Sequence, residues 1–287
     1  MISYYRKHKN KILNLSLKKI YSYFFLNNIK KYIYYYYLKN LLYQFFVFKN
    51  PNLNNQNFIN DLDSLVVHRD NYQDLSVTLE QLFNSEFKID DDIESHYKSN
   101  EKKILLKFII YSINTKLIKR KYVDIYDFAI NQIKDPLKIL EIGGGMPHGF
   151  IYSYWKRKKF FFDHIHYIDA NLLHSDFVKW YFQNNNISNS IELYPAAKTP
   201  KIDNIEFNFI FAKDIFEHLD DPDTLIEDII SNTTNSKTLL CLDLEHKGAK
   251  TVQHINPNLP ILKKKLENNN FQVIKKFDEV HIWKKMQ

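Results

Sequence analysis

Short apolar runs alternate with longer amphipathic segments along the second half of the chain. This alternation predicts repeated strand–helix–strand units and a mainly parallel sheet. The apolar runs place the strands at residues 137–142, 164–169, 191–195, 207–212, 238–244, 271–277 and 280–284. Only a few residues separate the last two runs, so we expect these strands to pair as an antiparallel hairpin.

Helical periodicity fills the gaps between the strands and continues ahead of the first one. Residues 61–131 have a helical pattern, and residues 121–134 indicate one more helix before the sheet. Asp221 followed by Pro222 is typical of a helix start, with an N-cap side chain and proline at the first helical position. A later helix is expected over residues 259–267.

Charge is distributed unevenly along the 287 residues. Residues 1–60 carry ten Lys or Arg and no Asp or Glu, so the overall charge of +7 leaves residues 61–287 at −3. The same stretch is rich in aromatic residues, including Tyr34 to Tyr37, but lysine and asparagine interrupt its apolar runs. A membrane span needs about 20 largely apolar residues. We therefore expect short amphipathic helices that pack on the main domain, or that contact an anionic membrane or a phosphorylated substrate.

The bulk composition bounds the class of protein. Apolar residues make up 45% of the chain, which is enough to bury a core. The single cysteine, Cys241, excludes an internal disulfide and fits a buried small residue in mid-strand. Because the sequence shows no secretory signal pattern, we expect a cytoplasmic protein.

Glycine is concentrated just after the first predicted strand. Four of the five glycines fall within seven positions, at Gly143, Gly144, Gly145 and Gly149. A strand that ends in a glycine-rich turn before a helix is typical of cofactor sites at the carboxyl edge of α/β sheets. The dinucleotide pattern G-x-G-x-x-G fits poorly, because His148 stands at its third glycine and Glu141 is charged where that fold favours an apolar residue.

The window KILEIGGGMPHG (Lys138 to Gly149) resembles motif I of the class I S-adenosylmethionine-dependent methyltransferases. Glu141, Gly143 and Gly145 match the motif, while Pro147 stands at its third glycine. The segment FNFIFAKDIFEHLDDPDTLIEDI (Phe207 to Ile229) resembles the family's fourth strand and the EHlpdP motif that follows it. The resemblance covers roughly residues 125–287. It implies a Rossmann-like α/β fold with a seven-stranded, mostly parallel sheet whose last strand is antiparallel.

An aspartate ends the second predicted strand. Asp169 in HIHYIDAN lies 24 residues beyond Gly145, and a carboxylate there can accept bidentate hydrogen bonds from two ribose hydroxyls. The alternative is a capping aspartate after a strand. The family often has an acid near the adenine after the third strand, but LYPAAKTP (Leu193 to Pro200) has none. Adenine would then depend on backbone groups around Ala196 and Ala197, or on apolar packing.

The resemblance implies S-adenosylmethionine as cofactor. Gly143 and Gly145 would let the backbone approach its methionine moiety, and Glu141 would lie near its ammonium group. The full set of expected cofactor contacts is Glu141, Gly143, Gly144, Gly145, Asp169, Ala170, Ala197 and Lys213.

The expected catalytic residues are Asp214, His218 and His254. On a helical turn Asp214, Glu217 and His218 can share one face. Their D-x-x-E-H spacing resembles the E-x-x-E-H signature of metal-dependent O-methyltransferases, in which these residues bind a divalent ion. His254, or less favourably His246, would add a ligand or a base. Because E-H at this position also occurs in metal-free methyltransferases, we expect no metal and name Asp214, Glu217, His218 and His254 only as candidate ligands.

We expect a basic aromatic helical extension at 1–60, a helical lid region at 61–124 and a methyltransferase domain at 125–287. The expected reaction is O-methylation of a small-molecule or glycan acceptor. One alternative is a non-catalytic binding or scaffold protein that keeps the fold. Another is an enzyme like the metal-dependent RNA 2′-O-methyltransferases, although nucleic acid is not the expected partner.

Overall fold

The computed structural model describes residues 121–145, 147–157, 161–202, 206–233, 237–244, 259–277 and 280–287, together with six positions between 37 and 48. The chain divides into two compact units, Met1–Asp61 and Leu62–Gln287. In the first unit the six described residues are helical, and Leu41 and Phe45 among them are buried. Most of the expected extension and lid lies outside the described residues, so these segments stay predictions.

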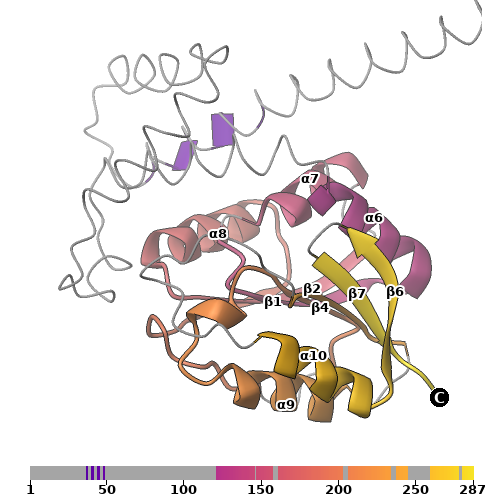
Figure 1. Ribbon diagram of the computed structural model, residues 1–287. Helices are drawn as coiled ribbons and strands as arrows, with labels where there is room; N and C mark the ends of the chain where they lie inside the picture. Colours follow the sequence, from indigo (N-terminus) through magenta and orange to yellow (C-terminus); the bar gives the residue numbers. More distant parts are fainter. Residues whose placement is uncertain are drawn as a thin grey trace, which may run out of the picture. The chain divides into compact units, whose positions relative to one another are not determined.

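A seven-stranded sheet forms the centre of the second unit (Figure 1). Its strands are β1 (Leu137–Ile142), β2 (Phe162–Asp169), β3 (Asn189–Leu193), β4 (Phe209–Ala212), β5 (Leu239–Asp243), β6 (Phe271–Phe277) and β7 (Val280–Lys285). The strand order is β3-β2-β1-β4-β5-β7-β6. β7 runs antiparallel to both β5 and β6, and the pairings among β1 to β5 are parallel. The expected sheet and its closing hairpin are confirmed.

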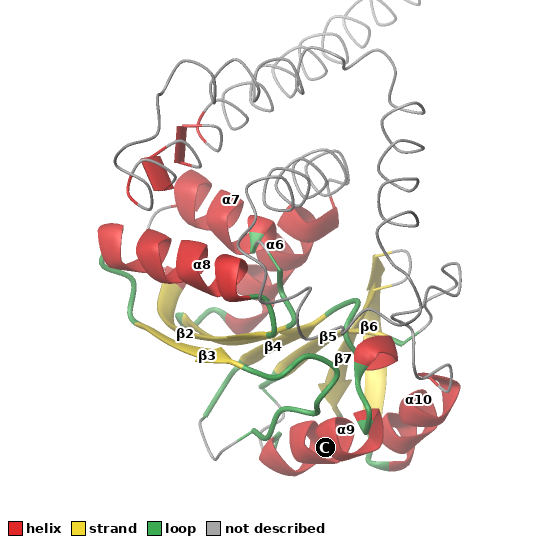
Figure 2. Ribbon diagram, turned by 90° about the vertical axis from the view of Figure 1, so that its left-hand side faces the viewer, coloured by secondary structure: helices red, strands yellow, loops and turns green. Residues whose placement is uncertain are grey.

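Helices cover both faces of the sheet (Figures 1 and 2). α6 (Lys121–Ile133), α7 (His148–Arg157) and α8 (Leu172–Asn184) lie on one face, and α9 (Pro222–Asn232) and α10 (Leu259–Asn268) lie on the other. Strand side chains alternate between the two faces. Leu140 and Leu240 therefore join the aliphatic cluster of α9 and α10. Phe209 points to the other face, where its ring lies 5.3 Å from that of Tyr126 in α6.

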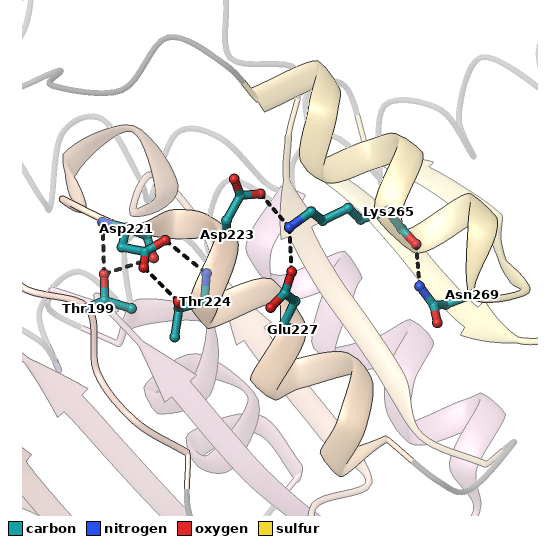
Figure 3. Close-up of polar contacts among 7 residues, drawn as sticks. All are labelled: Thr199, Asp221, Asp223, Thr224, Glu227, Lys265 and Asn269. Carbon is teal, nitrogen blue, oxygen red and sulfur yellow. Dashed lines mark hydrogen bonds and ion pairs between the residues drawn. The ribbon is translucent and has the colours of Figure 1, made fainter.

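Asp221 anchors α9, as the sequence predicts. Its Oδ1 accepts the Thr224 N–H at 3.1 Å, and its Oδ2 accepts the Thr224 hydroxyl at 2.6 Å. The hydroxyl of Thr199, in the loop after β3, accepts the Asp221 N–H at 3.0 Å and donates to the Asp221 carbonyl at 2.9 Å (Figure 3). The loop after β3 is thereby attached to the start of α9.

An exposed ion-pair network joins α9 to α10. Lys265 of α10 contacts Asp223 at 2.9 Å and Glu227 at 2.6 Å (Figure 3). Exposed pairs of this kind contribute little to stability because water screens them. In the part of the chain that the structure describes, no helix combines the length and the apolar character needed to cross a bilayer.

We expect Asp221→Ala to lower the free energy of unfolding more than Glu227→Ala does. The first change leaves a helix-start N–H without its acceptor, whereas the second removes one partner of an exposed ion pair. Urea denaturation followed by circular dichroism measures both losses. Equal losses would contradict the role of Asp221 as the anchor of α9.

Candidate functional site

β1 ends in a tight turn formed by its glycines. Gly143 and Gly145 have φ angles of 62° and 55°, a left-handed conformation that glycine adopts without a steric penalty. The Gly143 N–H donates to the Ile168 carbonyl at 2.8 Å, which ties the turn to β2. α7 follows directly, so the strand–turn–helix order expected from the sequence is present.

Asp169, the last residue of β2, holds this turn from one side. Its Oδ2 accepts the Gly145 N–H at 2.8 Å, and its Oδ1 accepts the Asn171 N–H at 2.7 Å. The Tyr167 hydroxyl bridges Asp169 Oδ2, at 2.9 Å, and the Gly145 carbonyl. A carboxylate has about four acceptor positions, so the protein itself uses up to three of them. When the Tyr167 hydroxyl donates to Oδ2, the open position is on Oδ1. The bidentate ribose contact expected from the sequence stays a prediction.

Glu141, from β1, supports the turn from beneath. It is buried, and its Oε2 accepts the Tyr126 hydroxyl of α6 at 3.1 Å. A Cβ added to Gly144 would overlap Glu141 Oε1, so only glycine lets the carboxylate lie against this backbone. Burial and the charge of Glu141 raise the pKa of Tyr126 well above its usual value, which keeps the phenol protonated as a donor. Glu141 and Asp169 therefore contact adjacent residues of the same turn.

The segment after β4 packs against the other side of the turn. A Cβ placed on Gly143 would lie 2.6 Å from Ile215 Cδ1, which shows how closely this segment approaches. Lys213 and Asp214 form an ion pair just ahead of Ile215. Asp214 has a φ of 50°, a left-handed conformation that is uncommon outside glycine and that clusters at functional sites.

Asp214, Glu217 and His218 do not lie on one continuous helical turn. The 3₁₀ helix η3 spans only Phe216–His218, and the left-handed Asp214 precedes it. Glu217 is buried, and its Oε1 is 3.9 Å from His218 Nε2. Among the described residues no group of three His, Cys, Asp or Glu side chains is arranged to hold a metal ion.

The remaining expected residues are spread around this edge. Ala170 follows Asp169 and is half-buried. Ala197 has a φ of 62°, and its carbonyl accepts the Asp220 N–H at 2.8 Å. Cys241 is buried as expected, and burial raises the pKa of its thiol. His246 and His254 lie outside the described residues.

Sequence reasoning missed polar residues that complete the site. Tyr167 precedes Asp169 by two positions, and strand alternation could have placed both on one face. Asn171 Oδ1 accepts the His174 N–H at 3.0 Å at the start of α8, and His174 Nδ1 lies 3.9 Å from Asp169 Oδ1.

Asp243 was also missed, and its signal was an acid at the end of the apolar run LLCLD. Its side chain is fully buried at the carboxyl end of β5. Burial, reinforced by the Asp214 carboxylate and opposed by Lys213, raises the pKa of Asp243 to about 7. Near neutral pH this carboxyl group can therefore hold or release a proton at the site edge.

The chain is similar to several solved structures at low sequence identity. No protein-family model matches the chain, and no curated protein sequence does. A methyltransferase dependent on S-adenosylmethionine from Clostridium acetobutylicum matches with a TM-score of 0.43 and 11% identity, over 62% of this chain and 97% of that one. The Burkholderia thailandensis 1,6-didemethyltoxoflavin-N1-methyltransferase, solved with bound 1,6-didemethyltoxoflavin and S-adenosylhomocysteine, matches with a TM-score of 0.44 and 12% identity, over 63% of this chain and 86% of that one. The 4+2 cyclase SpnF matches with a TM-score of 0.41 and 16% identity, over 55% and 59%.

We expect Gly144→Ala to cost about 1–3 kcal/mol of unfolding free energy, because the added methyl group overlaps the Glu141 carboxylate. In a Glu141→Ala background that overlap is gone, so the same change should cost much less. Urea denaturation of the wild type, both single variants and the double variant measures this coupling. Additive losses would contradict the close contact between residues 141 and 144.

The raised pKa of Asp243 predicts a pH-dependent stability. The carboxyl group titrates near 3.8 when unfolded and at about 7 when folded, so between these values only the folded state holds the proton. Stability should therefore fall as pH rises from about 4 to 7, by at most about 1.4 kcal/mol per pH unit, and then level off. Asp243→Asn should flatten this slope in urea denaturation between pH 5 and 8. An unchanged slope would assign it to other groups.

Proposed function

We propose that this chain is a class I S-adenosylmethionine-dependent methyltransferase that methylates a hydroxyl of a small molecule or glycan. The observation that carries the proposal is the clamp between the Gly145 N–H and the Asp169 carboxylate. Strand order places the ends of β1, β2 and β4 side by side, and ligands of open α/β sheets bind at this carboxyl edge. The glycine turn, Asp169 and the segment from Lys213 to His218 all meet there.

The residues at this edge fit an adenosine group. We assign the open acceptor position on Asp169 Oδ1 to one ribose hydroxyl. Ala170 and the backbone near Ala197 are proposed to lie beside the base, and Lys213 at the far side of the turn. Glu141 is buried and bonded to Tyr126, so we propose that it acts on the cofactor through the shape of the turn.

Catalysis by this chain would consist of positioning and proton removal. When bound, S-adenosylmethionine would supply a sulfonium methyl group for in-line transfer to an acceptor oxygen. We propose that His218 takes the proton of the acceptor, because its side chain is partly exposed and Glu217 lies near its ring to stabilise the charged form. Asp214, held by Lys213, is proposed to orient the acceptor. His254 stays a candidate base on sequence grounds.

A second candidate is a non-catalytic protein that keeps the fold. The observation in its favour is that Asp169 is largely satisfied by the protein's own Gly145, Asn171 and Tyr167. The turn is thus held without a cofactor. For the N-terminal residues 1–60, we propose contact with an anionic membrane or a phosphorylated acceptor on the basis of their charge. A cytoplasmic location of the protein stays a prediction from the sequence.

Calorimetry with S-adenosylhomocysteine tests the proposal. We expect Asp169→Asn to weaken binding about 10- to 100-fold, because an amide nitrogen cannot accept the hydroxyl hydrogen bond that the carboxylate accepts. Asp163→Asn, an exposed position on the same strand, is the matched control and should bind like the wild type. If wild-type protein gives no heat at high micromolar ligand, the non-catalytic alternative stands.

The same titration resolves how Asp169 is used. With one acceptor position open, only one of the 2′-deoxy and 3′-deoxy analogues should bind markedly more weakly than the parent compound. A similar loss for both analogues would mean that a ribose displaces the Gly145 N–H and takes two positions. Such a result would revise the contact without removing the cofactor.

A further inference from the structure

A second polar cluster lies on the sheet face opposite Asp169. His164 and His166 occupy alternate positions of β2, so both side chains point to the face away from Tyr167 and Asp169. The parallel register sets Ser190 of the edge strand β3 beside His166. His164 Nε2 lies 3.1 Å from Ser190 Oγ, and His166 Nδ1 lies 2.5 Å from the same atom. Two imidazole nitrogens therefore converge on one point.

The outer nitrogens of both rings face polar side chains. His164 Nδ1 is 2.9 Å from Ser188 Oγ, and His166 Nε2 is 3.6 Å from Glu192 Oε2. In metal sites a ligating imidazole almost always gives its other ring nitrogen to a carboxylate, a carbonyl or water, which fixes the tautomer and the orientation of the ring. The Glu192 carboxylate is an ion-pair neighbour of His166 Nε2 rather than a hydrogen-bond partner, and it favours the tautomer with the proton on Nε2. In that tautomer the lone pair of His166 is on Nδ1, the nitrogen that points to the shared centre.

We propose that His164 and His166 form a binding site for a divalent transition-metal ion. Imidazole nitrogen suits Zn²⁺, Cu²⁺ and Ni²⁺, and the ion would take two nitrogens from one strand. The Ser190 hydroxyl now occupies the centre and can leave it by a change of χ1 to another staggered rotamer. Water or that hydroxyl would fill the remaining coordination positions. The site is independent of the proposed methyl transfer.

Solvent reaches the cluster, and charged side chains lie near it. The His166 side chain is 15% exposed and that of Glu192 is 44% exposed, so an ion can enter from solvent. Glu192 supplies negative charge beside the pair. Lys138 of β1 pairs with His164 and opposes a cation, but it is exposed and its long side chain can extend into water. Binding would tie the edge strand β3 to β2, because Ser190 and Glu192 of β3 lie beside the ligating rings.

Titration of the full chain with Zn²⁺ at pH 7.5, followed by calorimetry, tests the site. The wild type should bind one Zn²⁺ ion at a site with a higher affinity than any other site on the protein. His164→Ala and His166→Ala should each weaken this binding at least about 100-fold. Glu192→Gln should weaken it about 10-fold, because it removes the carboxylate beside the His166 ring. Ser190→Ala should bind at least as tightly as the wild type, because it clears the centre. His8→Ala controls for the loss of an imidazole elsewhere in the sequence.

A second measurement keeps the test decisive if a variant fails to fold. Zn²⁺ added to wild-type protein should shift two histidine ring signals in NMR spectra, raise the melting temperature, and do neither at pH 5, where imidazoles are protonated. The proposal is overturned if the wild type binds no ion stoichiometrically. It is equally overturned if no pair of histidine signals shifts, or if His166→Ala binds as tightly as the wild type.

Discussion

The hydrogen bond from the Gly145 N–H to the Asp169 carboxylate is the contact on which this edge of the sheet depends. It joins the turn after β1 to the end of β2, and it is possible because Gly145 adopts a left-handed φ of 55°. The Glu141 carboxylate packs against the backbone of the adjoining Gly144. A side chain at either glycine would strain or displace the turn, so backbone conformation and buried charge determine each other here.

Burying several carboxylates at one sheet edge has a large desolvation cost, and the fold offsets it group by group. Glu141 accepts a hydrogen bond from a phenol hydroxyl, and Asp169 accepts hydrogen bonds from two backbone amides and a phenol hydroxyl. Asp243 takes the other route, because burial beside Asp214 favours its protonated form. The edge can therefore hold a proton near neutral pH, which is a useful property where an acceptor hydroxyl must be deprotonated.

One strand, β2, serves both faces of the sheet. Tyr167 and Asp169 point towards α6, α7 and α8, while His164 and His166 point to the opposite face. The side chains of β3 follow the same alternation, so Ser190 and Glu192, together with Ser188 just ahead of the strand, lie beside the histidines. The position of β3 at the sheet edge leaves this second cluster open to solvent, whereas the central strands β1 and β4 are covered on both sides.

Local properties of the sequence determined the strands, the glycine turn and the cap of α9. Apolar runs, glycines and the Asp221–Pro222 pair affect the structure of only a few neighbouring residues, so they can be recognised from the sequence alone. The bounds of β3 escaped prediction because Asn189 and Ser190 become strand only by pairing with Ile165 and His166 of β2. The tertiary structure decided the strand order, the bridge from Tyr167 to Gly145, the raised pKa of Asp243 and the convergence of two histidines on Ser190. Each of these depends on contacts between residues distant in sequence, or on burial from water, and neither is visible until the chain has folded.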